Sequence, residues 1–196
     1  MAIINKNRKI VIIAFIIFGI LSLSSCKFVI KTFYGIKKPK IETEKSLKKY
    51  LKRKGINSNN IYAVSQNDFM QITKQIGGIP EILIFDKNGN NIMYKEEGQC
   101  NANAFDFIDN ISKDMKFKYN NSLKLDNYIS KLKYFNGKPA TIDKSKDIDF
   151  YLFIFWARYT GRLNKNHVKI WEKLANNNTK CNIKVIKVNL DKQEWW

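Results

Sequence analysis

The chain has 196 residues, of which 44% are hydrophobic and 13% aromatic, and this composition is typical of a folded domain with a packed core. Lysine and arginine outnumber aspartate and glutamate by 35 to 17, which gives a formal net charge of +18. The lysines are spread over nearly every segment and interleaved with asparagine, so they indicate a solvated surface rather than a dedicated nucleic-acid site. One histidine and three cysteines without a CxxC pair exclude a zinc site of familiar spacing, and no metal or cofactor is expected.

The first 25 residues have the pattern of an export signal. A basic start at positions 6–9 precedes the apolar run 10–23, which is shorter than the ~20 residues of a membrane-spanning helix. The run ends in a tetrapeptide that resembles the lipobox of bacterial lipoproteins: Leu23, Ser24, Ser25 and Cys26. That resemblance implies a lipid on the Cys26 thiol and cleavage just before this residue.

The alternative interpretation of this start is an uncleaved anchor helix with an incidental cysteine. Under the lipoprotein interpretation, residues 26–41 are a lipid anchor and a short basic tether, and membrane lipid is the partner reached through Cys26. Export makes nucleic acid an unexpected partner. The predicted location is the cell envelope, with inner and outer membrane both open.

Alternating helix and strand patterns follow over residues 42–115. Apolar residues at helical spacing predict a helix over 46–51 that ends at Gly55, and residues 61–64 read as a buried strand. Ser65 or Asn67 can cap the next helix, which the glycine pair after Ile76 interrupts. Residues 79–94 contain two apolar runs around an Asn-Gly turn, which predicts a β-hairpin, and 104–111 predicts another amphipathic helix.

Residues 116–148 are polar and predict an irregular connector with one helical patch near Leu125. The strongest apolar strand is 150–156, followed by a helix with an apolar face over 168–175 and a strand over 183–188. Two buried strands joined by a helix form a βαβ unit, so residues 149–196 predict a partly parallel sheet. The fold class is therefore α/β, a mixed sheet flanked by helices.

Two segments resemble parts of the thioredoxin fold. Residues 154–163, with the helix and strand after them, resemble the hydrophobic strand, redox loop, helix and second strand of membrane-tethered thioredoxin-like oxidoreductases. Residues 78–89 resemble the loop with a cis-proline, the hairpin strand and its turn, which makes Pro80 a candidate cis-proline. The resemblance implies a binding loop after the first segment, with these candidate residues: Trp156, Arg158, Tyr159, Thr160, Gly161, Arg162 and Leu163.

The chain departs from the family pattern in two ways. The two cysteine positions of the redox loop fall on Thr160 and Leu163, and neither side chain can attack or resolve a disulfide. The order of the two segments is also reversed. Either one permuted sheet contains both, or a thioredoxin-like domain near 41–115 precedes a second, partial βαβ element; the helix and strand at 43–64 favour the two-piece arrangement.

These observations predict a membrane-anchored, non-catalytic thioredoxin-like lipoprotein that binds or scaffolds an envelope protein. The alternative is an enzyme related to thiol–disulfide oxidoreductases that uses Cys100 or Cys181, and a third possibility is a purely structural envelope protein. Nothing in the sequence brings Cys100 and Cys181 together, so both are expected to be unpaired. Trp156 is expected in the core, and His167 on a helix flank.

Overall fold

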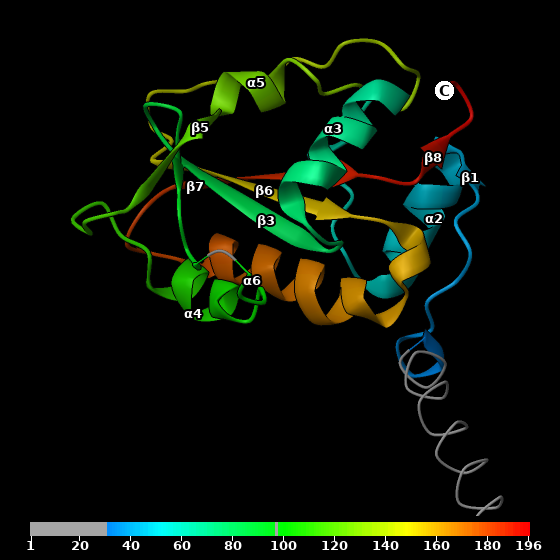
Figure 1. Ribbon diagram of the computed structural model, residues 1–196, viewed down its shortest axis with the longest axis horizontal. Helices are drawn as coiled ribbons and strands as arrows, with labels where there is room; N and C mark the ends of the chain where they lie inside the picture. Colours follow the sequence, from blue (N-terminus) through cyan, green and yellow to red (C-terminus); the bar gives the residue numbers. More distant parts are fainter. Residues whose placement is uncertain (1–30, 97) are drawn as a thin grey trace, which may run out of the picture.

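The computed structural model describes residues 31–96 and 98–196. Its centre is a mixed six-stranded β-sheet with the strand order β2-β7-β6-β3-β4-β5, and helices flank both faces of the sheet (Figure 1). The predicted signal segment and the lipobox at 23–26 lie outside the described residues. Within the described ranges, no helix is long and apolar enough to cross a membrane.

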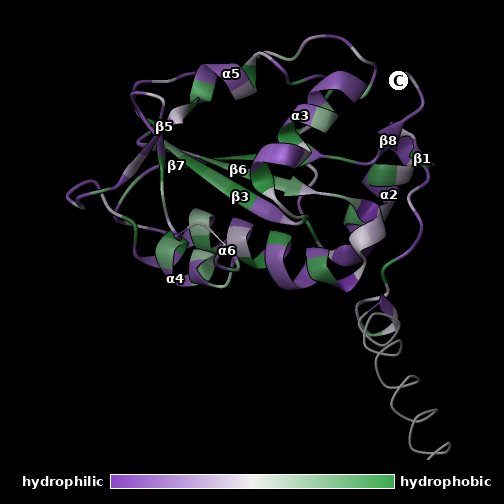
Figure 2. Ribbon diagram, in the orientation of Figure 1, coloured by the Kyte–Doolittle hydropathy of each residue, from purple (hydrophilic) through white to green (hydrophobic). Residues whose placement is uncertain are grey.

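Three apolar strands form the middle of the sheet because most of their side chains have no polar group to present to water. All seven residues of β6 (Phe150–Trp156) are buried, and β7 (Ile183–Asn189) pairs with β6 in parallel. On its other side, β6 pairs with the antiparallel β3 (Glu81–Asp86), and Glu81 lies opposite Phe155. The predicted βαβ unit is confirmed, and Figure 2 shows the apolar character of these strands.

Shorter strands extend the sheet at both edges. β2 (Ile61–Tyr62) pairs in parallel with β7. At the opposite edge, β4 (Asn90–Ile92) returns antiparallel to β3, which confirms the predicted hairpin, and β5 (Tyr119–Lys124) pairs with β4. Gly89 in the hairpin turn has a φ of 82°, a conformation that glycine adopts without steric cost.

Helices cover the two faces of the sheet and divide the core into two apolar clusters. α2 (Glu44–Lys54), α4 (Asn103–Asn110) and α6 (Lys169–Asn177) pack on one face. α3 (Gln66–Ile76) and α5 (Leu125–Ile129) pack on the other. Both clusters include side chains of β6, because a fully buried strand alternates its residues between the two faces.

The helix ends follow local sequence signals. The Thr43 side chain accepts a hydrogen bond from the Ser46 backbone N–H at 3.1 Å and caps α2, which ends at Gly55 in the left-handed conformation. Ser65, one of the two predicted caps, does the same for α3 through the Asp68 N–H at 3.2 Å. α3 ends at Gly77, also left-handed, as the glycine pair predicted.

The two segments that resemble thioredoxin lie in one sheet, since β3 pairs with β6 along its whole length. The two-piece arrangement that the sequence favoured is therefore replaced by the single-sheet arrangement. Both faces of β3 and of β6 carry apolar side chains. Because the two strands pair side by side, the same helices cover the apolar side chains of both strands.

Three short features were not predicted from the sequence. β5 lies within the expected irregular connector, and η2 (Asn164–Val168) is one turn of π-helix leading into α6. β1 (Ile41–Glu42) pairs in parallel with β8 (Lys192–Gln193). This last pairing brings the segment that follows the predicted anchor to the C-terminal end of the chain, beside the loop after β6 (Figure 1).

Candidate functional site

The loop that follows β6 is anchored inward rather than presented to solvent. Trp156 is fully buried and its indole stacks on the Tyr50 ring with centroids 6.2 Å apart, so it is a core residue. Arg158–Thr160 form η1, a 3-10 turn. Gly161 then adopts a φ of 66° and a ψ of −118°, a backbone conformation that favours glycine.

The Thr160 hydroxyl, at the first of the two family cysteine positions, is part of a buried polar network. It lies 2.7 Å from the Ala157 carbonyl and 3.0 Å from Asn164 Oδ1, and it can donate its proton to either. Asn164 donates to the Tyr50 hydroxyl at 2.9 Å, and that hydroxyl donates to the Gly161 carbonyl at 3.1 Å. With hydrogen-bond acceptors and no basic group beside it, the hydroxyl ties the loop together and lacks the partner that activates a nucleophile.

A buried carboxylate joins this loop to the segment after β7. Asp191 accepts a hydrogen bond from the Arg158 backbone N–H at 2.5 Å and one from Asn189 Nδ2 at 2.8 Å. Burial is the main cause that raises the pKa of Asp191 to about 6; the hydrogen bonds from Arg158 and Asn189 oppose this rise, and the nearby Glu42 carboxylate contributes to it. Glu42, itself buried, forms an ion pair with the Arg158 guanidinium. The other oxygen of Asp191 has no hydrogen-bond partner among the described residues.

The N-terminal segment lies directly on this loop. The Lys37 backbone N–H donates to the Tyr159 carbonyl at 2.9 Å, and Arg162 Nη1 donates to the Phe33 carbonyl at 3.0 Å. A side chain at Gly161 would place its Cβ 2.3 Å from the carbonyl oxygen of Tyr34, so the two backbones are in close contact. The expectation that the whole loop is presented for binding is therefore corrected for residues 158–161.

Leu163, the last of the candidate loop residues, lines a groove that Pro80 also lines. The groove has a volume of about 880 Å³ and runs along the start of β3. The Ile79–Pro80 peptide bond at this point is cis, and the Pro80 carbonyl accepts a hydrogen bond from Asn101 at 2.8 Å. Residues from four parts of the chain line the groove, among them Pro80, Leu83, Tyr94, Cys100, Leu163 and His167.

On the side of this groove, the start of β3 has no strand partner within the described residues. Only Ile84 and Phe85 of the described strand pair with β4, whereas β6 pairs with β3 from Glu81 to Asp86. The groove is lined by residues 79–83, which precede the paired part of the hairpin. Side chains occupy backbone groups of this segment: the Ile82 N–H donates to Glu81 and the Pro80 carbonyl accepts from Asn101.

The groove contains a buried acid and a partly buried imidazole. Glu81 accepts hydrogen bonds from the Ile82 N–H at 2.9 Å, from Lys95 at 2.5 Å and from the Tyr94 hydroxyl, so its charge is compensated. Burial lowers the pKa of His167, whose ring packs against Trp171 with centroids 5.1 Å apart. His167 Nδ1 also lies 3.1 Å from the Leu163 carbonyl, so the ring is held at the helix flank.

The two cysteines within the described ranges are unpaired, one exposed and one buried. Cys181 lies with its Sγ 3.3 Å from the Ile111 carbonyl, and burial raises its pKa to about 11, so its thiol stays protonated at neutral pH. Cys100 is exposed and lines the groove beside Pro80. Cys26, the predicted lipidation site, lies outside the described residues.

Structure and sequence agree on only part of the site. The structure brings Pro80 and Leu163 to one groove, as the family resemblance implied, and turns Trp156 and Thr160 into the interior. Sequence reasoning missed the buried polar residues beneath the loop, which are Glu42, Tyr50, Asn164, Asn189 and Asp191. Among the described residues, no three His, Cys, Asp or Glu side chains are placed to hold a metal ion.

Comparisons with known proteins add no assignment to this geometry. No family model, no curated protein sequence and no solved structure matches the chain.

Proposed function

We propose that this protein is a membrane-anchored, non-catalytic thioredoxin-like lipoprotein that binds an extended segment of an envelope protein in the groove beside Pro80. The single observation that carries the binding function is the groove of about 880 Å³ that Pro80 and Leu163 line together. An extended peptide can lie along such a groove, where the side chains of the groove give specificity.

The thioredoxin-like assignment is supported by how the two resembling segments meet. Glu81, the residue after the cis-proline, lies opposite Phe155, two residues before the loop begins at Ala157. Pro80 is therefore held next to the loop at the same end of the sheet, as the resemblance to thioredoxin-like proteins implies. The helix after the loop then leads into β7, the parallel neighbour of β6.

The absence of redox chemistry in this proposal follows from the residues at the two cysteine positions. A threonine hydroxyl held by acceptors and a leucine side chain cannot form or resolve a mixed disulfide. Cys100 places its thiol in the groove. The thiol of Cys181, the other described cysteine, contacts the Ile111 carbonyl, and burial keeps it protonated. Cys100 and Cys181 therefore do not form a pair in which one thiol attacks a disulfide and the other resolves the mixed disulfide.

The exposure of Cys100 favours one alternative function. An exposed thiol that lines the groove is placed to form a disulfide with a bound partner in an oxidising compartment. In that case, partner adducts on non-reducing gels disappear in Cys100→Ser. Adducts that persist in Cys100→Ser leave the non-covalent groove as the binding site.

Site-specific photo-crosslinking of the anchored protein in cells tests the proposal. A benzoylphenylalanine at position 163, in the groove, should give a discrete adduct, and the adduct should be lost with Leu83→Asp on the groove wall. The matched control is the same probe at Ile170, an exposed apolar position on α6 outside the groove. Equal adducts from both positions, or no adduct from position 163, would contradict binding in the groove.

A further inference from the structure

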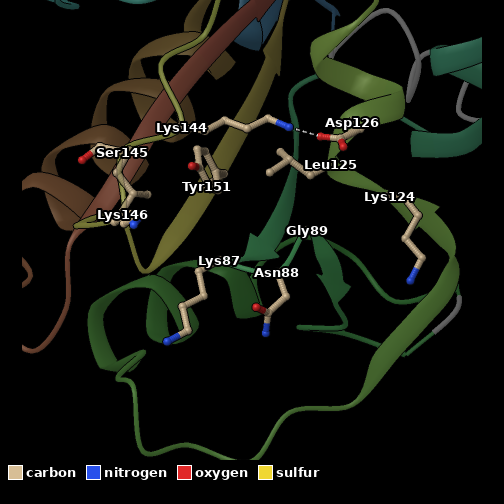
Figure 3. Close-up of a pocket in the computed structure, with 11 residues that line it drawn as sticks. Lys87, Asn88, Gly89, Lys124, Leu125, Asp126, Lys144, Ser145, Lys146 and Tyr151 are labelled. Atoms are coloured by element: carbon tan, nitrogen blue, oxygen red, sulfur yellow. Dashed lines mark hydrogen bonds and ion pairs between the residues drawn. The ribbon is translucent and has the colours of Figure 1, made fainter.

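A second cavity, at the opposite end of the sheet, has the charge of an anion-binding site. It has a volume of about 580 Å³ and lies between the turn after β3, the junction of β5 with α5 and the segment 144–146 (Figure 3). Lysines come from all three of these parts of the chain and line the cavity: Lys87, Lys124, Lys144 and Lys146. The one acidic residue among its described lining residues is Asp126.

The charges of this lysine cavity are only partly compensated. Lys144 forms an ion pair with Asp126, drawn as a dashed line in Figure 3, but both side chains are about half or more exposed, with 47% and 75% of their surface open. Exposed ion pairs contribute little free energy, so an incoming anion can replace Asp126 as the partner of Lys144. Lys124 donates to Asn90 Oδ1 at 2.9 Å, an uncharged partner that leaves its positive charge in place.

The floor of the lysine cavity adds a hydrogen-bond donor to the four ammonium groups. Tyr151 of β6 is 3% exposed and lines the cavity. Burial raises the pKa of its hydroxyl, and the nearby Lys144 charge opposes this rise. The hydroxyl is not among the buried polar atoms, so it is open to the cavity and can donate a hydrogen bond to a group that occupies it.

We propose that the lysine cavity binds a small anion of the phosphate class, held by the four ammonium groups and by a hydrogen bond from the Tyr151 hydroxyl. Ammonium groups act as compact point charges and suit the dispersed charge of phosphate oxygens. The volume exceeds that of one phosphate, so a pyrophosphate or a phosphate ester fits this description better than a single inorganic phosphate.

The position of the cavity favours a dissolved anion over a lipid headgroup. Residues 33–37, which follow the predicted anchor, contact the loop after the C-terminal end of β6, whereas Tyr151 lies near the N-terminal end of the same strand. With the chain anchored at Cys26, the length of the sheet therefore separates the cavity from the membrane end. This step depends on the proposed anchoring, but the binding of the anion itself does not.

Calorimetric titration of the full chain in detergent with pyrophosphate tests the proposal, at a constant ionic strength of about 0.1 M so that screening does not change. One site per chain is expected. Lys87→Gln with Lys146→Gln should weaken binding at least about tenfold, since each lysine supplies a charged contact. Both side chains are exposed, so the fold tolerates the change. The matched control is Lys45→Gln with Lys49→Gln on exposed positions of α2, which removes the same charge and should leave the affinity unchanged.

Tyr151→Phe should weaken pyrophosphate binding several-fold, because it removes only the hydroxyl from the cavity floor. Absence of pyrophosphate binding would overturn the proposal. Equal losses of affinity in the cavity pair and the α2 pair would also overturn it, because binding would then depend on the overall charge of the chain. A second arm measures binding to phosphatidylglycerol vesicles. If Lys87→Gln with Lys146→Gln leaves vesicle binding unchanged, the cavity binds a dissolved anion. If this double variant abolishes vesicle binding and the α2 variant does not, the ligand is a lipid headgroup, and the proposal of a dissolved anion is overturned.

Discussion

The backbone N–H of Arg158 donates a hydrogen bond to Asp191 Oδ2 at 2.5 Å, and this contact joins the loop after β6 to the segment after β7. The acceptor is a buried carboxyl whose second oxygen has no partner among the described residues. Burial raises its pKa to about 6, so this carboxyl keeps its proton to a higher pH in the folded chain than in the unfolded chain. The same buried group therefore fixes the loop and makes the free energy of unfolding depend on pH.

The first prediction concerns this pH dependence. The pKa of Asp191 is higher in the folded chain than in the unfolded chain, so its stabilising contribution is present below about pH 4 and is lost as the pH rises through about 6. A pKa moved from about 4 to about 6 corresponds to about 3 kcal/mol. Asp191→Asn cannot ionise. The difference in unfolding free energy between wild type and Asp191→Asn, measured by urea titration, should fall by about this amount between pH 4 and 7.5.

An unchanged difference across that range would show that Asp191 does not titrate in the folded protein as its burial implies. Asp126→Asn is the matched control, because it removes the same charge from an exposed carboxyl.

The second prediction concerns the contact between the N-terminal segment and the loop. Gly161→Ala would place a Cβ 2.3 Å from the Tyr34 carbonyl oxygen and 2.4 Å from that of Gly35, so residues 34–35 must move away. Gly77→Ala is the control: its φ of 71° is also positive and unfavourable for alanine, but nothing lies within 4 Å of the new Cβ. Cleavage between residues 31 and 40 by a limiting amount of protease should be several-fold faster in Gly161→Ala only.

Equal cleavage rates in the two alanine variants would mean that backbone strain alone, and not the close contact, determines how the N-terminal segment is held. Unfolding by urea separates the two effects, since both variants should lose about 1 kcal/mol or more from strain.

The parts of the fold that the sequence predicted correctly are those with strong local patterns. The apolar runs of β3, β6 and β7 and the cap at Ser65 depend on a few residues each, so they could be predicted without knowing their neighbours in the fold. β5 gave no such signal, because a mostly exposed edge strand needs no apolar alternation.

The site was harder to predict because its important contacts join residues far apart in the chain. Asn164 donates to Tyr50 across 114 positions, and Arg158 pairs with Glu42 across 116. Asparagine, aspartate and glutamate are common surface residues, and nothing in their local sequence marked these as buried. The resemblance to the thioredoxin fold did locate Pro80 and Leu163. It did not indicate that residues 33–37 lie on the loop after β6.

The third prediction concerns the anchor. The basic start, the apolar run and the lipobox-like end at Cys26 imply that this thiol carries lipid. Cys26→Ser should abolish labelling by a clickable fatty acid and leave an unprocessed precursor of higher mass on gels. Cys100→Ser is the matched control and should be labelled and processed like the wild type. Full labelling of Cys26→Ser would contradict the lipoprotein interpretation and favour an uncleaved anchor helix.

The last prediction concerns the loop that resembles a redox loop. The wild-type protein should not reduce insulin, whereas Thr160→Cys with Leu163→Cys should gain measurable thiol–disulfide exchange. The two positions differ in environment. Position 163 is the N-cap of the helical segment that continues into α6 and is partly exposed in the groove, where free backbone N–H groups favour a thiolate. Position 160 is 3% exposed and beside two oxygen acceptors, which favour the protonated thiol.

Leu163→Cys alone should therefore react with a disulfide reagent faster than Thr160→Cys alone, and the double variant should be the only form that turns over insulin. Leu163→Ala with Thr160→Ser is the control that changes both sizes without adding thiols. Insulin reduction by the wild type would overturn the non-catalytic proposal. An inert double variant that is folded would contradict the alignment of this loop with the redox loop of thioredoxin-like proteins.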